Sequence, residues 1–337
     1  WPQIRPGMLA GWLIISLYVL SDFGSVSLMR FETFSYSIFL EYSVAFDRSY
    51  AAWLALITIG IAASLLFLDA HLLKNKNICR CNPGAARKAR LKQLGKWSYL
   101  AYTFLGLIIF IALFIPIFSI TAWTSKLSWQ ASWQSISLPI VNSLQAALPT
   151  ALISCLVALA ISYHSVYFPS RLFRITERIA HFGFAMPPLA LGLAIIFFSL
   201  KFTPGIYHSL FILILAYVLH CLAIGMGPIR SSLQHTPYQL QEAAYTLQQT
   251  PVRALQKIII PLTSKAMLAS IALVFLLVMK ELPLTILLAP AGYQTLATTV
   301  WSYTNEAIFD KAAPFAASII IISSLFLGLL LKYQEHE

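Results

Sequence analysis

Charged side chains are scarce in this sequence. They make up 10% of the 337 residues, whereas 59% are hydrophobic; soluble domains carry roughly 25% charged residues. A water-soluble fold cannot bury that much apolar surface. Long apolar stretches recur, and each reaches the ~20 residues that a helix needs to cross a bilayer. The composition excludes an ordinary soluble domain and predicts an all-α, polytopic helical membrane protein.

The sequence also lacks the motifs of bond-making chemistry. It has no Gly-rich phosphate loop ending in Lys-Ser/Thr, so we expect no ATP site and no bound cofactor in this chain. Cys79-x-Cys81 has no second ligand pair, so no zinc site is predicted. His220 and Cys221 are adjacent in a span and point about 100° apart, so a packed histidine is expected rather than a metal ligand. We expect a transport protein, not an enzyme.

Acidic residues are few, 12 against 23 Lys and Arg, and the net charge is +11. The positions of the basic residues decide between a nucleic-acid partner and a membrane. Seventeen fall in alternate loops and five in the opposite loops, with Lys280 inside a span. Because Lys and Arg resist translocation, the basic loops and both termini are predicted to be cytoplasmic. Lipid is the expected partner, and nucleic acid is not.

Eight apolar stretches are predicted to span the membrane. The second and third are separated by eight basic and no acidic residues from Lys74 to Lys96, which we interpret as a cytoplasmic linker. The spans are about 8–28, 51–70, 99–120, 140–163, 179–200, 207–228, 266–289 and 313–331.

Two parts of the chain repeat each other. A shift of 259 residues places Asp22 on Glu281, and after a four-residue length difference Phe46-Asp47-Arg48 falls on Phe309-Asp310-Lys311. Each copy contains a span with an acidic residue near its outer end, an aromatic-bearing outer segment and a returning span. Both copies begin on the same side of the membrane, so the repeat is parallel.

These observations divide the chain into three parts. Residues 1–70 are interpreted as the last two spans of a first half, 71–98 as the linker, and 99–337 as a complete six-span second half. The chain opens at Trp1 without an initiator Met, and we interpret it as a fragment or a processed product.

The segment 229–265, between the fourth and fifth spans of the second half, carries the most specific pattern. Glu242 is predicted to lie in one short helix, and Thr250 to cap a second that begins at Pro251. Two short apolar helices on the cytoplasmic face are suited to docking in a groove of a soluble partner. The expected apolar positions are Ala243, Ala244 and Leu247 in the first helix, and Val252, Leu255, Ile258 and Ile259 in the second, ahead of Pro261.

Glu242-Ala243-Ala244, a turn, and Ile258-x-x-Pro261 resemble the EAA loop of ABC importer permeases, the element that seats in the ATPase subunit. That family normally has Gly, which tolerates positive φ, where this chain has Gln248. We take Gln248-Gln249-Thr250-Pro251 as the substitute turn. The resemblance implies a MetI-like architecture in the bacterial inner membrane, a periplasmic substrate-binding protein, and cytoplasmic ABC ATPase subunits that bind ATP and Mg.

A narrower resemblance concerns the repeated segments. Met279-Lys280-Glu281-Leu282-Pro283-Leu284-Thr285 is similar to the second half of the fused, twelve-span ferric iron permeases, and Ser21-Asp22-Phe23-Gly24-Ser25-Val26-Ser27 to the matching place in their first half. The resemblance implies ferric iron as the substrate. Related fused permeases for thiamine share the architecture, so thiamine or another small solute is the alternative.

Asp22 and Glu281 lie near the outer ends of equivalent spans, where a charge costs roughly 2.5–3.5 kcal/mol unless it is paired or hydrated. We interpret them as pathway residues, because carboxylate oxygens suit a trivalent cation. Alternatively, Glu281 pairs with Lys280, or both acids cap helices. The breaks at Met186-Pro187-Pro188 and near Gly225 either mark the path or are ordinary features of membrane helices.

Two further classes of protein compete with the permease interpretation. A secondary transporter or channel needs no ATPase, so copurification of a nucleotide-binding subunit separates it from an ABC permease. A membrane-embedded enzyme should show clustered polar groups across several spans, and this sequence has too few.

Overall fold

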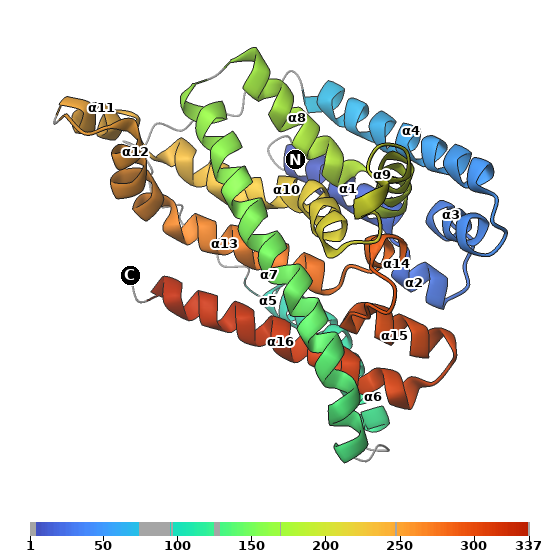
Figure 1. The fold of residues 1–337 in the computed structure, drawn as a ribbon. Helices are drawn as coiled ribbons and strands as arrows, with labels where there is room; N and C mark the ends of the chain where they lie inside the picture. The colour runs from blue at the N-terminus through green and yellow to red at the C-terminus, as the bar shows by residue number, and fades with distance from the viewer. Residues whose placement is uncertain are drawn as a thin grey trace.

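The computed structural model describes residues 5–73, 95, 97–124, 129–168, 170–246 and 248–335. Every regular element in these ranges is a helix, which confirms the all-α prediction (Figure 1). The helices are α1 Arg5–Ser21, α2 Gly24–Leu28, α3 Phe34–Ser43, α4 Arg48–Leu73, α5 Trp97–Ile109, α6 Ile115–Thr124, α7 Trp129–Tyr167, α8 Arg171–Ala185, α9 Pro188–Phe202, α10 Leu210–His235, α11 Gln239–Thr246, α12 Pro251–Ala254, α13 Ile260–Met279, α14 Pro283–Leu288, α15 Leu296–Asn305 and α16 Phe309–Glu335.

Six helices of the described part are long and apolar enough to cross a membrane. Two more, α8 and α9, pass the same test together but bend by 111° between them, and the apolar part of α1 is shorter, Gly11–Ser21. The eight predicted spans therefore correspond to six long helices, one bent pair and one short helix. The six are Arg48–Leu68, Trp97–Thr124, Ser135–Tyr167, Leu210–His235, Val252–Met279 and Phe309–Leu330.

Three of the predicted spans are interrupted, which corrects their bounds. The stretch 8–28 breaks after Ser21 and 179–200 breaks after Ala185, while the helix of 266–289 ends at Met279. At the second break, Pro187 adopts an extended conformation and Pro188 begins α9. A proline cannot donate to the preceding turn and it disfavours helix in the residue before it, so the chain turns there.

The core lies where α7, α10 and α13 pack together. Tyr217 and Phe275 are fully buried in it. Gly225 of α10 faces Ser270, whose Oγ would lie 3.0 Å from a Cβ added to the glycine, and the Cβ of Ala158 on α7 is 3.8 Å away. Small residues let membrane helices approach closely, so this packing depends on shape rather than on large side chains.

The repeat predicted from the sequence is visible in the order of the helices. In one copy α1 breaks at Asp22 before α2, α3 and α4; in the other, α13 breaks around Glu281 before α14, α15 and α16. The third helix of each copy has a threonine N-cap, Thr33 and Thr295. The returning helices, α4 and α16, lie on opposite sides of the molecule (Figure 1).

The backbone conformation ahead of the two returning helices corrects the sequence alignment of the two copies. Before the returning helices, Phe46 (φ 57°) and Ala307 (φ 61°) both have left-handed backbones. These positions are 261 residues apart, whereas the Phe-Asp-basic alignment required a shift of 263. Asp47 caps α4 through the Tyr50 N–H, but Asp310 lies inside the first turn of α16. Acids are favourable at several positions of a helix start, so the residue pattern recurs without a common register.

Helices α5 and α6, joined by the π-helical segment Phe110–Phe114, have no buried residue in this chain. They contact the rest of the structure mainly where α6 packs against α16. The linker ahead of α5 falls largely outside the described residues, including 74–94 with Cys79-x-Cys81. The interpretation of 71–98 as a linker therefore stays a prediction.

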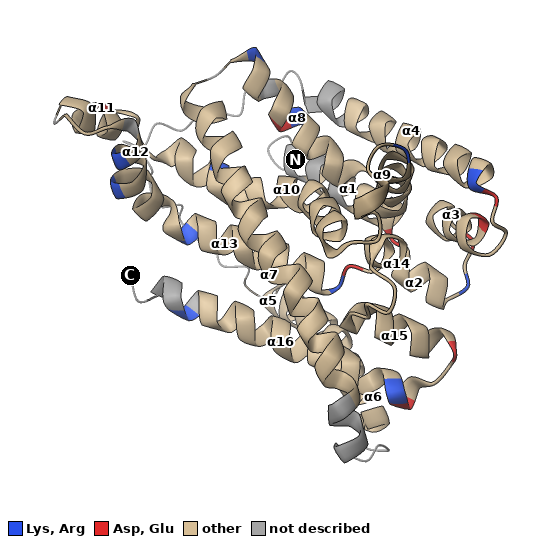
Figure 2. Cartoon of the chain, in the orientation of Figure 1, with Lys and Arg blue, Asp and Glu red and all other residues tan. Residues whose placement is uncertain are grey.

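The two ends of the bundle differ in charge. Lys and Arg mark α12, the start of α13 and the end of α16, whereas at the other end Asp and Glu around α3, α15 and the starts of α4 and α16 stand beside basic residues (Figure 2). We call the first the loop end, because it carries α11 and α12.

Candidate functional site

Helix α11 presents part of the predicted docking motif to solvent. Glu242 and Ala243 are exposed, while Gln241 and Ala244 are buried against the bundle. Ala243, Ala244 and Leu247 were expected to share one apolar face, but Ala243 and Ala244 do not, because they point in different directions around the helix. Leu247 lies outside the described residues. On α12, the next helix of the loop, Val252 is also exposed, at 62%.

The turn after α11 keeps the backbone that a glycine would favour. Gln248 has φ 57°, its N–H donates to Tyr245 O at 2.9 Å, and the Gln249 N–H donates to Ala244 O at 3.1 Å. These two bonds form a Schellman motif. A side chain in the left-handed region costs roughly 1–2 kcal/mol. The chain thus forms the same kind of turn without Gly, at an expense in stability.

The second helix of the loop begins as predicted but does not end as a separate element. Thr250 accepts the Arg253 N–H at its Oγ1 (3.4 Å), and Pro251 opens α12. The chain then continues through a π-helical segment, Leu255–Ile259, directly into α13. This corrects the expectation of two short helices before a new span. The π-type bond from Ile260 N–H to Leu255 O immediately precedes Pro261, which has no N–H to donate.

The apolar stripe of this second helix is divided by burial. Ile259 is fully buried, and Ile258 and Leu255 are partly buried against the end of the core, but Val252 is exposed. The stripe therefore anchors the helix to the bundle at one end and leaves Val252 exposed.

A hydrogen bond that the sequence did not reveal holds α11 on the bundle. Gln241 is fully buried, and its Oε1 accepts the Tyr163 hydroxyl of α7 at 2.8 Å. One turn later, the Tyr167 hydroxyl donates to Thr236 O at 3.0 Å at the end of α10. The aromatic rings of Tyr163, Tyr167 and Tyr238 pack nearby. These hydrogen bonds fix the loop to α7 and to the end of α10.

A second candidate site is a cavity of about 450 Å³ between the two repeated breaks. Asp22 and Glu281, 259 residues apart, both line it, together with His220, Lys280 and Trp301. Trp301 Nε1 donates to Ser27 Oγ at 3.0 Å and so ties α15 to α2 beside the cavity. The structure places the two predicted pathway acids at one site, while their role in transport stays a prediction.

One of the two acids also caps the short helix that follows it. Asp22 accepts the Ser25 N–H at Oδ1 (3.4 Å) and the Ser25 hydroxyl at Oδ2. The capping alternative drawn from the sequence is therefore observed for Asp22. It does not exclude a pathway role, because Asp22 and Glu281 both line the cavity.

Glu281 is the more enclosed of the two acids. It is 8% exposed, and its Oε1 is buried without a hydrogen-bond partner. The alternative of a pair with Lys280 is not found among the ion pairs of the described residues. Instead, Lys280 Nζ lies 5.9 Å from the centre of the Tyr18 ring. The Glu281 carboxyl therefore has unused acceptor capacity at the cavity wall.

Metal-ligand geometry is not found in the described residues, where no three His, Cys, Asp or Glu side chains are grouped to hold an ion. His220 is 4% exposed, and its Nδ1 lies 3.4 Å from Gly183 O on α8. Cys221 points into the core and is fully buried. This placement agrees with the expected packed histidine, although its ring also reaches the cavity wall.

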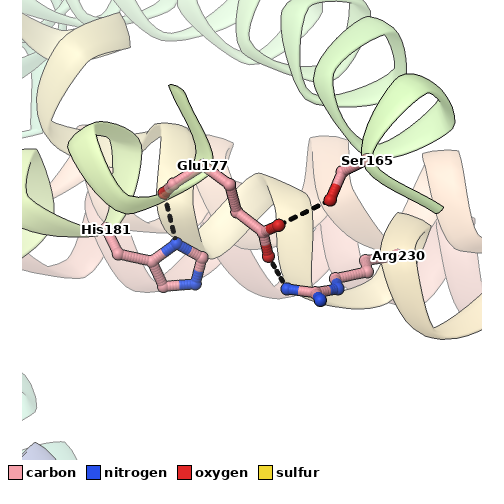
Figure 3. A network of polar contacts seen from close by, with 4 residues as sticks. All are labelled: Ser165, Glu177, His181 and Arg230. Atoms are coloured by element: carbon pink, nitrogen blue, oxygen red, sulfur yellow. Dashed lines mark hydrogen bonds and ion pairs between the residues drawn. The ribbon is translucent and has the colours of Figure 1, made fainter. Parts of the chain in front are cut away.

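Sequence reasoning missed an ion pair whose carboxylate is buried and whose guanidinium is partly exposed. Glu177 of α8 is paired with Arg230 of α10, and its Oε2 accepts the Ser165 hydroxyl of α7 at 2.6 Å (Figure 3). The Glu177 carbonyl also contacts His181 Nδ1 at 2.8 Å. The one available signal was an acid in a basic, amphipathic segment, and its partner is 53 residues away.

Comparisons with known proteins place these features in context. The sequence profile of the family described as "Binding-protein-dependent transport system inner membrane component" matches residues 151–334. The chain is 27% identical to the Fe(3+)-transport system permease protein FbpB 2 of Haemophilus influenzae, over 98% of this chain and 66% of that protein. It thus spans just under two thirds of that relative.

Other similarities are more partial. The chain is 24% identical to the sulfate transport system permease protein CysT of Salmonella typhimurium, over 66% of this chain and 86% of the relative. Among solved structures, "Crystal structure of an amino acid ABC transporter with histidines" is matched with 17% identity and a TM-score of 0.49, over 63% of this chain and 99% of that chain.

Proposed function

Because this chain belongs to the family of binding-protein-dependent transport system inner membrane components, which are ABC permeases, we propose that its α11–α12 loop docks a cytoplasmic ABC ATPase. The observation that carries the proposal is the exposure of Glu242, Ala243 and Val252 on a loop whose other face is fixed to the bundle. A loop seated in this way transmits force in both directions. ATP and Mg belong to the partner subunit, and this chain moves solute without making or breaking bonds.

The same proposal sets the orientation. The loop end, rich in Lys and Arg, faces the cytoplasm, so that both described ends of the chain, α1 and α16, meet that side. The charge distribution in Figure 2 supports this orientation, because basic loops resist translocation. A periplasmic binding protein then delivers the solute to the opposite end, near α3 and α15.

We propose ferric iron as the solute. Support comes from the Fe(3+)-transport relative, with 98% of this chain aligned. The residues of the cavity argue against direct coordination of iron by the protein. A cation coordinated by protein needs several oxygen or nitrogen ligands, and no such group is found in the described residues. Asp22 and Glu281 would attract the cation electrostatically while its own ligands, water or a chelator, stay bound.

A second solute class has its own supporting observation. Much of the cavity wall is apolar and aromatic, with Phe23, Phe184 and Trp301 beside the two acids. Aromatic faces next to carboxylates suit an organic cation. Thiamine or a similar small cation is therefore the alternative to iron.

In the larger assembly, 99–337 acts as one six-span half and 1–70 as two spans of the other half, and 71–98 links them. The two pathway acids would then face the cavity from both halves. This division follows the repeat of α1–α4 and α13–α16.

The test is coexpression of the permease with the ATPase and binding protein encoded beside it, followed by purification and uptake into proteoliposomes. We expect the ATPase to copurify with the wild type, and Glu242→Ala to weaken that association at least about tenfold. Glu306→Ala, which removes an exposed acid at the opposite end, is the matched control. Uptake of radioactive ferric iron, measured with and without excess thiamine, separates the two solutes. A wild type that transports with no ATPase would contradict the proposal and favour a secondary transporter.

A further inference from the structure

The two walls of the cavity are connected to the docking loop in different ways. Lys280 and Glu281 follow α13, which is continuous with α12 of the loop. Phe184 and Pro188, on another part of the wall, belong to α8 and α9, which are not continuous with the loop. Movement of the loop therefore reaches the first wall through one helix, whereas the second wall needs contacts between helices.

Helix α8 meets α10 at two separate places. Near the loop end, the Glu177 carboxylate binds the Arg230 guanidinium, and Ser165 of α7 donates to the same carboxylate (Figure 3). Near the cavity, a Cβ added to Gly183 would lie only 2.7 Å from Leu219 O, so the two backbones touch there. His220, the next residue, contacts both Gly183 O and the Phe184 ring.

The contact near the loop end depends on a carboxylate that needs particular partners. Glu177 is 8% exposed, and a carboxylate so enclosed persists only with partners for its oxygens. Both oxygens have one, since Arg230 binds Oε1 and Ser165 binds Oε2. Arg230 lies in the last two turns of α10, just before the chain passes into α11. Displacement of α10 by the loop would thus be passed to α8 through this ion pair.

We propose that Glu177 is a positioning residue that fastens α8 to α10, so that movement of the docking loop is transmitted to the Phe184 side of the cavity. The inference rests on the proposed function, because it requires an ATPase that moves the loop. Glu177 touches no solute in this arrangement and acts only through Arg230.

The experiment uses the complete transporter in proteoliposomes and measures solute transported per ATP hydrolysed. Glu177→Gln keeps the size and the Ser165 hydrogen bond but removes the charge. We expect it to lower transport per ATP at least about fivefold, while ATPase copurification and the melting temperature of the permease stay close to wild type. Arg230→Gln should cause the same loss, and the double variant should be no worse than either single variant, because both act through one contact.

The control is Arg178→Gln, which removes an exposed charge from the next position of α8 and should leave transport per ATP unchanged. Amide hydrogen exchange adds a measurement that does not depend on the ATPase: in Glu177→Gln, residues 171–185 should exchange faster while α10 keeps its protection.

Three results would overturn the inference. The first is an unchanged ratio of transport to ATP in Glu177→Gln. The second is a parallel loss of transport, ATPase binding and melting temperature, which would show a purely structural role. The third is α8 exchange that does not change. If no ATPase associates with the wild type, the proposed function fails as well, which distinguishes that outcome from the others.

Discussion

At both repeated breaks a long helix ends next to an acidic residue, but the surroundings of the two acids differ. In the first, Asp22 caps α2 at a partly exposed position; in the second, Glu281 stands just before α14 and is almost completely buried, with one oxygen unpartnered. The first break follows α1, which packs mainly against α4. The second follows α13, which packs against α7 and α10 in the core. Both copies place an acid at the break, and burial distinguishes the second acid from the first.

The largest expected difference between the breaks is in transport. Glu281→Gln keeps the size of the side chain but removes the carboxyl group from the cavity wall, and we expect uptake to fall at least about tenfold, in line with the functional weight of intramembrane acids. Asp22→Asn, the matched change at the more exposed break, should reduce uptake about threefold or less. Initial rates in proteoliposomes measure both. Equal, small effects would contradict the pathway role of Glu281.

Packing provides the next difference. A Cβ on Gly192 would lie 2.7 Å from Leu287 Cδ1, because α9 packs tightly on α14, whereas a Cβ on Gly24 of α2 would meet only Leu282 Cδ2 at 3.7 Å. Gly192→Ala should therefore destabilise the permease by about 1–3 kcal/mol, and Gly24→Ala should have little effect. The free energy of unfolding in detergent tests this pair. A larger cost at Gly24 would reverse the comparison.

Capping gives a smaller effect, confined to the first break. Asp22→Ala removes the acceptor for the Ser25 N–H and should cost about 1 kcal/mol, while Asp22→Ser keeps a good capping oxygen and should cost less. Glu281→Ala should be less costly than its burial suggests, since it also removes an unpartnered buried oxygen. Unfolding midpoints of the three variants decide the order; an Asp22→Ser variant as unstable as Asp22→Ala would argue against capping.

The smallest expected difference concerns the residues after the two short helices. Arg30 (φ 51°) and Gly292 (φ 78°) occupy left-handed backbones at corresponding places. Arg30→Gly should stabilise the chain by about 1 kcal/mol, because glycine adopts this conformation without a steric penalty. Gly292→Ala should have the opposite sign. Thermal unfolding measures both, and a loss of stability in Arg30→Gly would show that its side chain contributes more than its backbone costs.

The sequence indicated the repeat because both acids stand at the ends of long apolar runs, at equal distance from matching residues. It did not indicate the breaks beside them. Hydropathy averages over a window, so Met279 to Leu282 reads as part of one apolar run although the helix stops there. Helix ends depend on hydrogen bonds between the backbone and single side chains, such as the bond from the Ser25 N–H to Asp22. A single residue changes a window average too little to reveal such a bond.

The docking loop shows the same limit at shorter range. Thr250 and Pro251 were identifiable because capping chemistry is local. The left-handed Gln248 could be located only through the family resemblance, since glutamine itself does not indicate positive φ. The bonds from Tyr163 to Gln241 and from Arg230 to Glu177 join residues more than 50 positions apart. Neither partner has a pattern that identifies the other, so the three-dimensional packing was needed.

The uninterrupted passage from α12 into α13 has a geometric consequence. The helix Val252–Met279 has 28 residues, which at about 1.5 Å per residue is roughly 40 Å long. A tilt of about 10° around the docked end would displace the other end, next to Lys280, by roughly 7 Å. A displacement of that size is comparable to the width of a hydrated ion, so under the proposed docking a modest rotation at Val252 would become a movement large enough to matter for a solute at Glu281.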